Sequence, residues 1–221
     1  MSEAEFVLDE AREQRLGFGE AVFCAGKSPA QIATILDHAQ QPMLLTRLDP
    51  ERFAKLPAEQ QGDLDYDPVS HTAYFGAPAP LAATTRVAVV TAGTSDVPVA
   101  REAMRTLRFN GHAANLVSDV GVAGLWRLMR RLDELRAMPV LIVAAGMDAA
   151  LPSVMGGLLP GVIIAVPTSV GYGVAAGGHA ALNAILASCA PGIVTVNIDN
   201  GYGAACAAMR VLGTRTQQKL A

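Results

Sequence analysis

The chain has 221 residues and a formal net charge of -3, and 51% of its residues are hydrophobic whereas 17% are charged. This composition can bury a core, but it gives no electrostatic reason to expect a nucleic acid or an anionic membrane as partner. Its three cysteines fit neither a disulfide framework nor a zinc motif, and no apolar run approaches the roughly 20 residues that span a bilayer. We therefore expect a soluble, cytoplasmic protein.

The N-terminal part of the sequence predicts a small helical unit. Ser28 is the expected N-cap of a helix that begins at Pro29. A stretch rich in Asp, Pro, Thr and Ala follows, and it predicts a connector with one short edge strand at 73–75. We accordingly divide the chain into a mainly helical unit with its connector, residues 1–84, and a second domain, residues 85–221.

The second domain alternates between apolar, β-branched runs and segments compatible with helices. The expected strands are 86–90, 114–117, 140–144, 162–166 and 193–198. Five such units predict an α/β fold with a doubly wound, mostly parallel five-stranded sheet of flavodoxin-like type. Ligands of such sheets bind beyond the carboxyl ends of the strands.

Polar side chains or glycines follow every predicted strand at its carboxyl end. The candidate residues are Gly93, Thr94, Ser95, Asp96, Asp119, Asp148, Ser169, Tyr172, Gly173, His179, Asn197 and Asp199. Packing alone gives no reason to place such groups along one edge of a sheet, so this edge predicts a ligand site. The turn that ends at Ser95 precedes a helix and could bind a phosphate, although Ser95 or Asp96 could instead only cap that helix.

Two kinds of side chain in the second domain could carry out chemistry. Asp148 could act as a general acid or base or contact a metal, as readily as it could cap a helix. Cys206 is expected in the first turns of the last helix, where the helix dipole lowers a thiol pKa, so helix position favours it over Cys189 as the reactive thiol. An inert buried cysteine is the alternative for both.

Several stretches resemble the PurE-like carboxylase superfamily. These are AGTSD (92–96), GMDAALPSVMGGLLPGVIIAVPTS (146–169) and GGHAALNAILASCAPGIVTVNIDNGYGAA (177–205). SDVGVAGLWRL (118–128) and SVGYG (169–173) are similar to its LarB branch, which serves the biosynthesis of a nickel-pincer nucleotide cofactor. The purine-biosynthetic members carry a histidine after the second strand, where Val120 stands in this chain. That difference disfavours an aminoimidazole ribonucleotide carboxylase or mutase.

The resemblance implies a reaction and its participants. The pyridinium ring of nicotinic acid adenine dinucleotide would be carboxylated at C5 with CO2 or bicarbonate, and the phosphoanhydride would be hydrolysed. The products would be pyridinium-3,5-biscarboxylic acid mononucleotide and AMP. The resemblance further implies a divalent cation, Mg2+, near the pyrophosphate, and a homo-octamer. The alternatives are the purine-type carboxylase or mutase and a non-catalytic nucleotide sensor.

The resemblance also implies roles for individual residues. The ring is electron-poor, so a cysteine thiolate would add to it first and make a ring carbon nucleophilic. The family's cysteine motif matches ASCAPG and points to Cys189, in conflict with the helix-position argument for Cys206. Asp148 stands where the family has an acidic residue and would transfer a proton or contact the metal. Ser95 and Asp96 would hold the ribose or a phosphate of the substrate.

Overall fold

The computed structural model describes residues 6–217. The chain divides into two compact units, Met1–Pro80 and Leu81–Ala221, and each is described by itself. This boundary lies close to the predicted one. Among residues 6–217 we find no helix with the length and apolar character that a membrane span requires.

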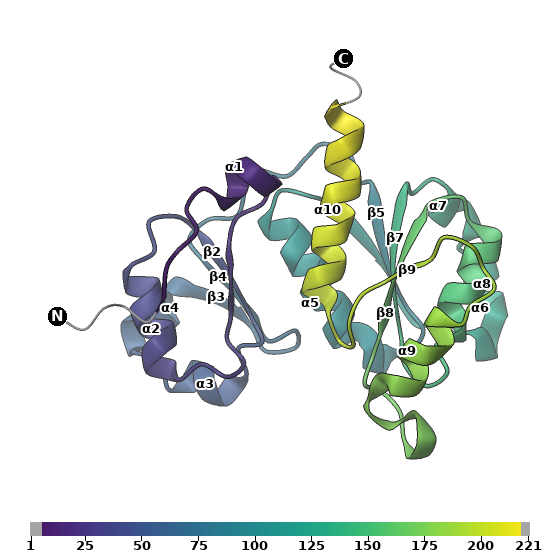
Figure 1. The fold of residues 1–221 in the computed structure, drawn as a ribbon, viewed down its shortest axis with the longest axis horizontal. Helices are drawn as coiled ribbons and strands as arrows, with labels where there is room; N and C mark the ends of the chain where they lie inside the picture. Colours follow the sequence, from purple (N-terminus) through teal and green to yellow (C-terminus); the bar gives the residue numbers. More distant parts are fainter. Residues whose placement is uncertain (1–5, 218–221) are drawn as a thin grey trace. The chain divides into compact units, whose positions relative to one another are not determined.

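The first unit contains a four-stranded mixed sheet with the strand order β1-β2-β4-β3 (Figure 1). Its strands are β1 (Ala21–Phe23), β2 (Met43–Thr46), β3 (Leu64–Asp67) and β4 (Thr72–Phe75). Its helices are α1 (Arg12–Leu16), α2 (Pro29–Asp37), α3 (Pro50–Ala54) and α4 (Ala58–Asp63). β1 runs parallel to β2, whereas β2 and β3 each pair antiparallel with β4.

The sheet corrects the prediction of a mainly helical unit over residues 1–84. Its strands are only three or four residues long, too short to establish an alternating pattern. All four residues of β2 are buried, so this strand shows no alternation at all. The predicted short strand is β4, and the predicted connector also contains β3.

The expected cap of α2 is confirmed. The Ser28 hydroxyl accepts the Gln31 N–H at 3.2 Å, and the Gln31 side chain accepts the Ser28 N–H at 2.9 Å. This reciprocal pair satisfies two backbone donors at the start of the helix.

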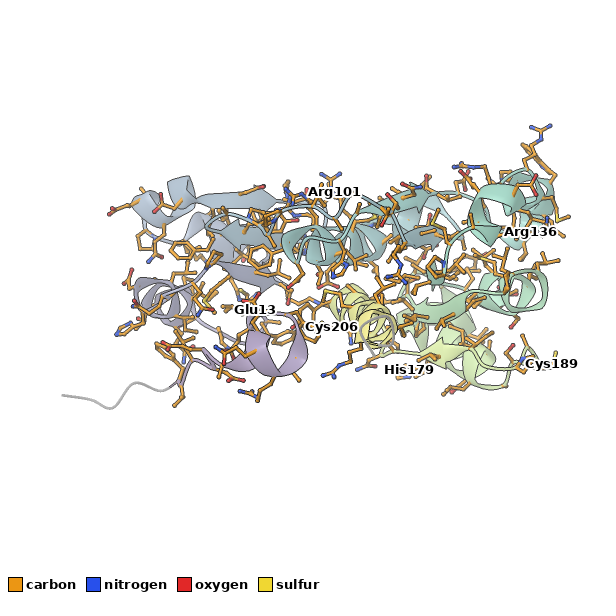
Figure 2. The ribbon with its side chains drawn as sticks, turned by 90° about the horizontal axis from the view of Figure 1, so that it is seen from above. Glu13, Arg101, Arg136, His179, Cys189 and Cys206 are labelled. Atoms are coloured by element: carbon orange, nitrogen blue, oxygen red, sulfur yellow. The ribbon has the colours of Figure 1, made fainter. Side chains whose placement is uncertain are left out.

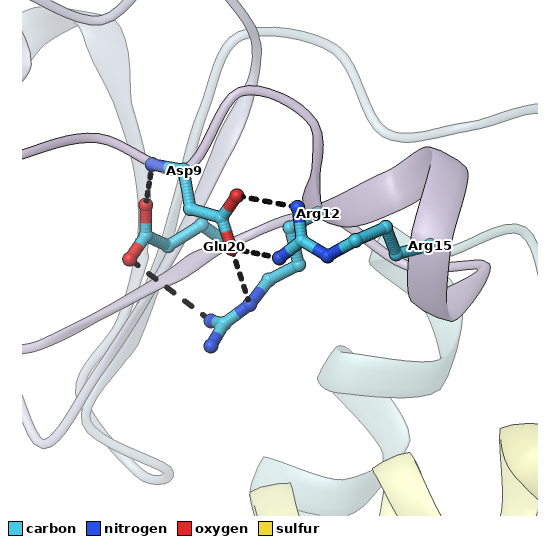
Figure 3. A network of polar contacts seen from close by, with 4 residues as sticks. All are labelled: Asp9, Arg12, Arg15 and Glu20. Carbon is cyan, nitrogen blue, oxygen red and sulfur yellow. Dashed lines mark hydrogen bonds and ion pairs between the residues drawn. The ribbon is translucent and has the colours of Figure 1, made fainter.

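A network of charged side chains holds the segment around α1 (Figure 3). Asp9 binds Arg15 with both carboxylate oxygens, at 2.9 and 2.5 Å, and its backbone N–H donates to Glu20 at 2.8 Å. The hydrogen bond from Arg15 lowers the pKa of the Asp9 carboxyl. Because Arg15 is exposed and the other side chains are only partly buried, the network orients the segment more than it stabilises the fold.

The second unit contains a five-stranded parallel sheet with the order β6-β5-β7-β8-β9, which confirms the predicted α/β fold (Figure 1). Its strands are β5 (Val87–Thr91), β6 (Ala114–Val117), β7 (Val140–Ala145), β8 (Val162–Pro167) and β9 (Val194–Thr195). β7 is central, and every one of its side chains is buried. β9 is shorter than predicted because it pairs with one neighbour only and its Val194 is exposed.

Helices cover both faces of this sheet. They are α5 (Val97–Phe109), α6 (Leu125–Met129), α7 (Leu132–Arg136), α8 (Ala150–Leu158), α9 (His179–Leu186) and α10 (Gly201–Gln217). α5 and α10 pack together on one face, and α8 and α9 pack on the other (Figure 1). Three 3-10 turns, η1 (Thr94–Asp96), η2 (Val122–Gly124) and η3 (Gly173–Gly178), lie in the loops after β5, β6 and β8. These loops connect the strands to the helices that cover the sheet.

Candidate functional site at the carboxyl edge

Backbone hydrogen bonds join the loops at the carboxyl edge of the parallel sheet. The Gly121 N–H donates to the Ala92 carbonyl at 2.8 Å, which ties the loop after β6 to the loop after β5. The Met147 N–H donates to the Val170 carbonyl at 2.8 Å and ties the loop after β7 to the loop after β8. Residues far apart in the sequence are thus assembled along one edge, as the sequence predicted.

Asp96 lies beneath this edge, with only 3% of its surface exposed. Its carboxylate accepts the Gly93 N–H at 2.8 Å and the Thr168 hydroxyl at 2.6 Å, and it is also hydrogen-bonded to the backbone of Gly146. Burial raises the pKa of Asp96 above its ordinary value, against these hydrogen bonds, and Asp199 adds to the rise. Asp96 therefore links the ends of β5, β7 and β8, and its expected contact with substrate stays a prediction.

Replacing Asp96 by Asn is expected to destabilise the protein and to change its dependence on pH. The amide NH2 cannot accept the Gly93 N–H, so about 1–3 kcal/mol of unfolding free energy should be lost. Because the folded state raises the pKa of Asp96 above 3.8, this carboxyl holds its proton more tightly when folded, and its contribution to stability falls as the pH rises. The Asn variant lacks this pH-dependent decrease in stability.

Urea denaturation at pH 4 and pH 7 measures both effects. The free-energy difference between wild type and Asp96→Asn should be smaller at pH 7 than at pH 4. A difference that grows with pH would contradict the raised pKa of the Asp96 carboxyl.

The loops at the carboxyl edge form a rim above Asp96. Most of the other candidate residues lie on this rim and are exposed to solvent. Exposed residues there are Thr94, Ser95, Asp148, Ser169, Tyr172, Gly173, His179 and Asn197. Asp199 is half-buried and accepts the Ser169 N–H at 2.8 Å, so it orients the loop after β8. Hydroxyls, one side-chain amide and the Asp148 carboxylate are thus exposed in loops at one edge of the sheet, and this composition suits a polar, phosphate-bearing ligand.

Asp148 stands at the tip of a strained turn between β7 and α8. Its neighbours Met147 and Ala149 have φ angles of 55° and 45°, the left-handed region that non-glycine residues rarely adopt. The Ala149 N–H donates to the Gly146 carbonyl at 2.8 Å and closes the turn. Asp148 is exposed, not buried, so it needs no buried partner. Strain of this kind is concentrated at functional sites, and here it presents a carboxylate to the rim.

Gly146 is the position where this turn has no room for a side chain. A Cβ there would overlap the Val170 carbonyl oxygen and lie 2.7 Å from the Thr168 hydroxyl. We expect Gly146→Ala to cost about 1–3 kcal/mol of unfolding free energy, because the loops after β7 and β8 must separate. Gly157→Ala, on α8 with nothing within 4 Å of its Cβ, is the matched control and should not destabilise. Equal urea midpoints for the two variants would show that the turn is not tightly packed.

Sequence reasoning missed Arg127, which lies on α6 and pairs with Asp119. Its guanidinium donates to the Asp119 carboxylate at 2.5 Å, and its Nε is buried with no acceptor among residues 6–217. The Asp119 N–H donates to Thr91 at the end of β5, at 3.2 Å. Asp119 therefore connects Arg127 to the rim. The eight-residue spacing between the two side chains crosses a loop and a 3-10 turn, so no helical pattern in the sequence could reveal the pair.

The three cysteines have different surroundings. Cys24, in the first unit, is fully buried, and burial raises its thiol pKa to about 12. Cys206 lies on α10, as expected from the sequence, and is half-buried. Cys189 is exposed in the loop after α9. Figure 2 shows Cys189 well apart from His179, the first residue of α9. The structure thus leaves Cys189 accessible but does not place it beside the rim residues of its own chain.

The described residues do not provide a complete set of protein ligands for the divalent cation expected from the resemblance. Within the described part of the chain, no group of three or more His, Cys, Asp and Glu side chains could hold an ion. Mg2+ is commonly bound through one or two carboxylates together with substrate phosphates. The rim carboxylates Asp148 and Asp199 suit such a shared site, but not a metal held by the protein alone.

A doubly wound parallel sheet with a polar carboxyl edge is typical of α/β proteins that bind a small ligand beyond the ends of their strands. Comparison with protein families makes this class more specific. Residues 86–221 match the AIR carboxylase family, and residues 4–77 match the LarB/PurE-like N-terminal domain. The chain belongs to the LarB/PurE-like carboxylase superfamily, and this membership indicates an enzyme of the carboxylase type.

Comparisons with individual proteins give less information than the family matches do. The uncharacterized protein MJ0165 of Methanocaldococcus jannaschii is 46% identical over 121 residues, which are 54% of this chain and 46% of that protein. The match thus spans about half the length of this curated relative. A crystal structure of a PurE2 variant from Treponema denticola aligns with a TM-score of 0.49 and 21% identity, over 58% of this chain and 79% of that chain.

Proposed function

We propose that the protein carboxylates C5 of the pyridinium ring of nicotinic acid adenine dinucleotide and hydrolyses its phosphoanhydride. The products are pyridinium-3,5-biscarboxylic acid mononucleotide and AMP. The observation that carries this choice within the superfamily is Val120, which is 3% exposed and packs in the core. No imidazole is available there for the proton transfers of a purine-type carboxylase. The match of residues 4–77 to the LarB/PurE-like N-terminal domain also supports this assignment.

In the proposed mechanism the Cys189 thiolate adds to a ring carbon and forms a C–S bond. The ring loses its aromaticity, and C5 becomes enamine-like and attacks CO2 to form a C–C bond. The C5 proton then passes to the Asp148 carboxylate. The electron pair left at C5 restores the aromatic ring and expels the thiolate, so the step needs neither an oxidant nor a reductant.

The turn after β5 is the proposed site for the phosphates. Thr94 and Ser95 are exposed, and their hydroxyls and backbone N–H groups lie directly ahead of the 13-residue helix α5. The positive end of a helix dipole favours anions at this position. The rim carboxylates Asp148 and Asp199 would hold a bound Mg2+, which would neutralise negative charge at the pyrophosphate. We also propose a cytoplasmic homo-octamer as the working form.

Mass spectrometry tests the proposal directly. Purified protein is incubated with nicotinic acid adenine dinucleotide, 13C-bicarbonate and Mg2+. AMP and a pyridinium mononucleotide heavier by one labelled carboxylate are expected. Unchanged dinucleotide, with the protein folded and the ligand bound, would contradict the proposal and favour a nucleotide sensor.

The second candidate is an aminoimidazole ribonucleotide carboxylase or mutase. It is favoured by the match of residues 86–221 to the AIR carboxylase family. Turnover of that ribonucleotide by the purified protein would establish this candidate, and its absence beside turnover of the dinucleotide would exclude it.

A further inference from the structure

The loop after β6 is joined to the end of β5 by three hydrogen bonds. The Asp119 N–H donates to the Thr91 hydroxyl at 3.2 Å, and the Val120 N–H donates to the Thr91 carbonyl at 3.1 Å. The Gly121 N–H donates to the Ala92 carbonyl at 2.8 Å. Asp119 has a φ angle of 60°, in the left-handed region that non-glycine residues rarely adopt. These bonds therefore hold Asp119 at the carboxyl edge in a strained backbone conformation.

A guanidinium group lies beside Asp119. The Arg127 side chain donates to the Asp119 carboxylate at 2.5 Å, and 31% of this side chain is exposed. Its Nε is buried without an acceptor, and Asp119 is the one acceptor of this guanidinium among residues 6–217. A Cβ added at Gly124 would come within 2.8 Å of this Nε and 3.1 Å of Nη2, so the glycine leaves the space in which the guanidinium lies. Arg127 consequently has hydrogen-bond donors that the protein itself does not use.

The order of the strands determines which part of the proposed substrate reaches Arg127. That order is β6-β5-β7-β8-β9, so the loop after β5 lies between the loops after β6 and β7. The proposed phosphate turn follows β5, and Asp148, which is proposed to act on the pyridinium ring, follows β7. Neighbouring strands lie about 4.8 Å apart. A dinucleotide that extends from the ring at β7 through the turn after β5 therefore continues to the loop after β6, where Arg127 pairs with Asp119.

We propose that Arg127 binds the phosphate of the AMP half of the substrate, and that this contact makes the protein prefer a dinucleotide to a mononucleotide. The inference rests on the proposed function and adds to it a second phosphate position, at the loop after β6. A planar guanidinium donates two parallel hydrogen bonds to phosphate oxygens, which suits it to this position. Asp119 orients the guanidinium through one of its nitrogens and leaves the other donors for the phosphate.

Calorimetric titration of the full-length protein with the two halves of the substrate tests the proposal without turnover. Arg127→Met is expected to bind AMP about tenfold more weakly than wild type, or weaker still, because the Asp119 carboxylate is then left facing the phosphate. The same variant should bind nicotinic acid mononucleotide as wild type does, since this half does not reach the loop after β6.

Arg136→Met is the matched control for the loss of an arginine. Arg136 also pairs with an aspartate, Asp133, but it lies on α7 ahead of the amino end of β7, at the opposite edge of the sheet. Its replacement should leave the affinities for AMP and for nicotinic acid mononucleotide unchanged.

A second variant moves the guanidinium without removing its charge. Gly124→Ala should also weaken AMP binding, whereas Gly157→Ala, with nothing within 4 Å of the added Cβ, should not. Wild-type affinity for AMP in folded Arg127→Met or Gly124→Ala, or no detectable binding of AMP by wild type, would overturn the proposal. Failure of the proposed function is distinguishable, since wild type would then form no labelled product from the dinucleotide, whatever its affinity for AMP.

Discussion

The Cys189→Ser variant is expected to lose carboxylation by on the order of 10^3-fold or more, with the fold unchanged. The reason is chemical: the electron-poor pyridinium ring becomes nucleophilic only after a thiolate has added to it, and a serine hydroxyl is not ionised near neutral pH. Cys189 is exposed, so the substitution removes no core contact. Incorporation of 13C from bicarbonate into the mononucleotide measures the loss.

Release of AMP should be followed in the same reactions. Hydrolysis of the phosphoanhydride does not use the ring chemistry. If Cys189→Ser releases AMP but incorporates no 13C into the mononucleotide, the two half-reactions are separable. Cys206→Ser is the matched control and should keep its carboxylation activity. Full activity of Cys189→Ser together with inactivity of Cys206→Ser would reverse the assignment and restore the helix-position argument for Cys206.

Cys24 offers no alternative source of the thiolate. It is fully buried in the first unit, and burial raises its pKa to about 12, so it stays protonated near neutral pH. Cys24→Ala should therefore affect stability and leave the chemistry intact.

The parallel sheet of the second unit was predictable because its three central strands are buried on both faces. The runs that form β5, β7 and β8 consist almost entirely of Val, Ile, Leu and Ala, and helical segments separate the strands. The same order of elements predicted which loops share the carboxyl edge. The first unit was not predictable in this way, since strands as short as β1 leave no periodic signal.

The arrangement of the rim residues could be predicted from the sequence only in part. The sequence placed Asp96 and Ser95 in one turn, but only the fold shows that Asp96 is buried and bonded to Thr168, 72 residues away, while Ser95 faces solvent. The left-handed residues that flank Asp148 carry no glycine signature, so the strained turn was likewise invisible. The family motif points to Cys189 as the expected reactive thiol, whereas the distance of Cys189 from the rim depends on the direction in which α9 runs.

Asp148→Asn is expected to lower carboxylation by about 10^2- to 10^4-fold, the usual contribution of a positioned general base. The amide keeps the shape of the carboxylate but cannot take the C5 proton. Because Asp148 is exposed, its replacement should leave the unfolding free energy nearly unchanged. Asp133→Asn is the control: this carboxylate is fully exposed on α7, where it pairs with Arg136, and it has no role in the proposed chemistry.

A substrate deuterated at C5 separates the two roles open to Asp148. If its carboxylate removes the proton, the deuterium isotope effect on carboxylation should increase in Asp148→Asn, because proton transfer becomes the slow step. If Asp148 only contacts the metal, higher Mg2+ concentrations should restore the rate without a change in the isotope effect. Asp148→Glu retains a titratable carboxylate and should keep more activity than the amide. A fully active Asp148→Asn would exclude both roles, and with them the reason for the strained turn that presents this side chain at the rim.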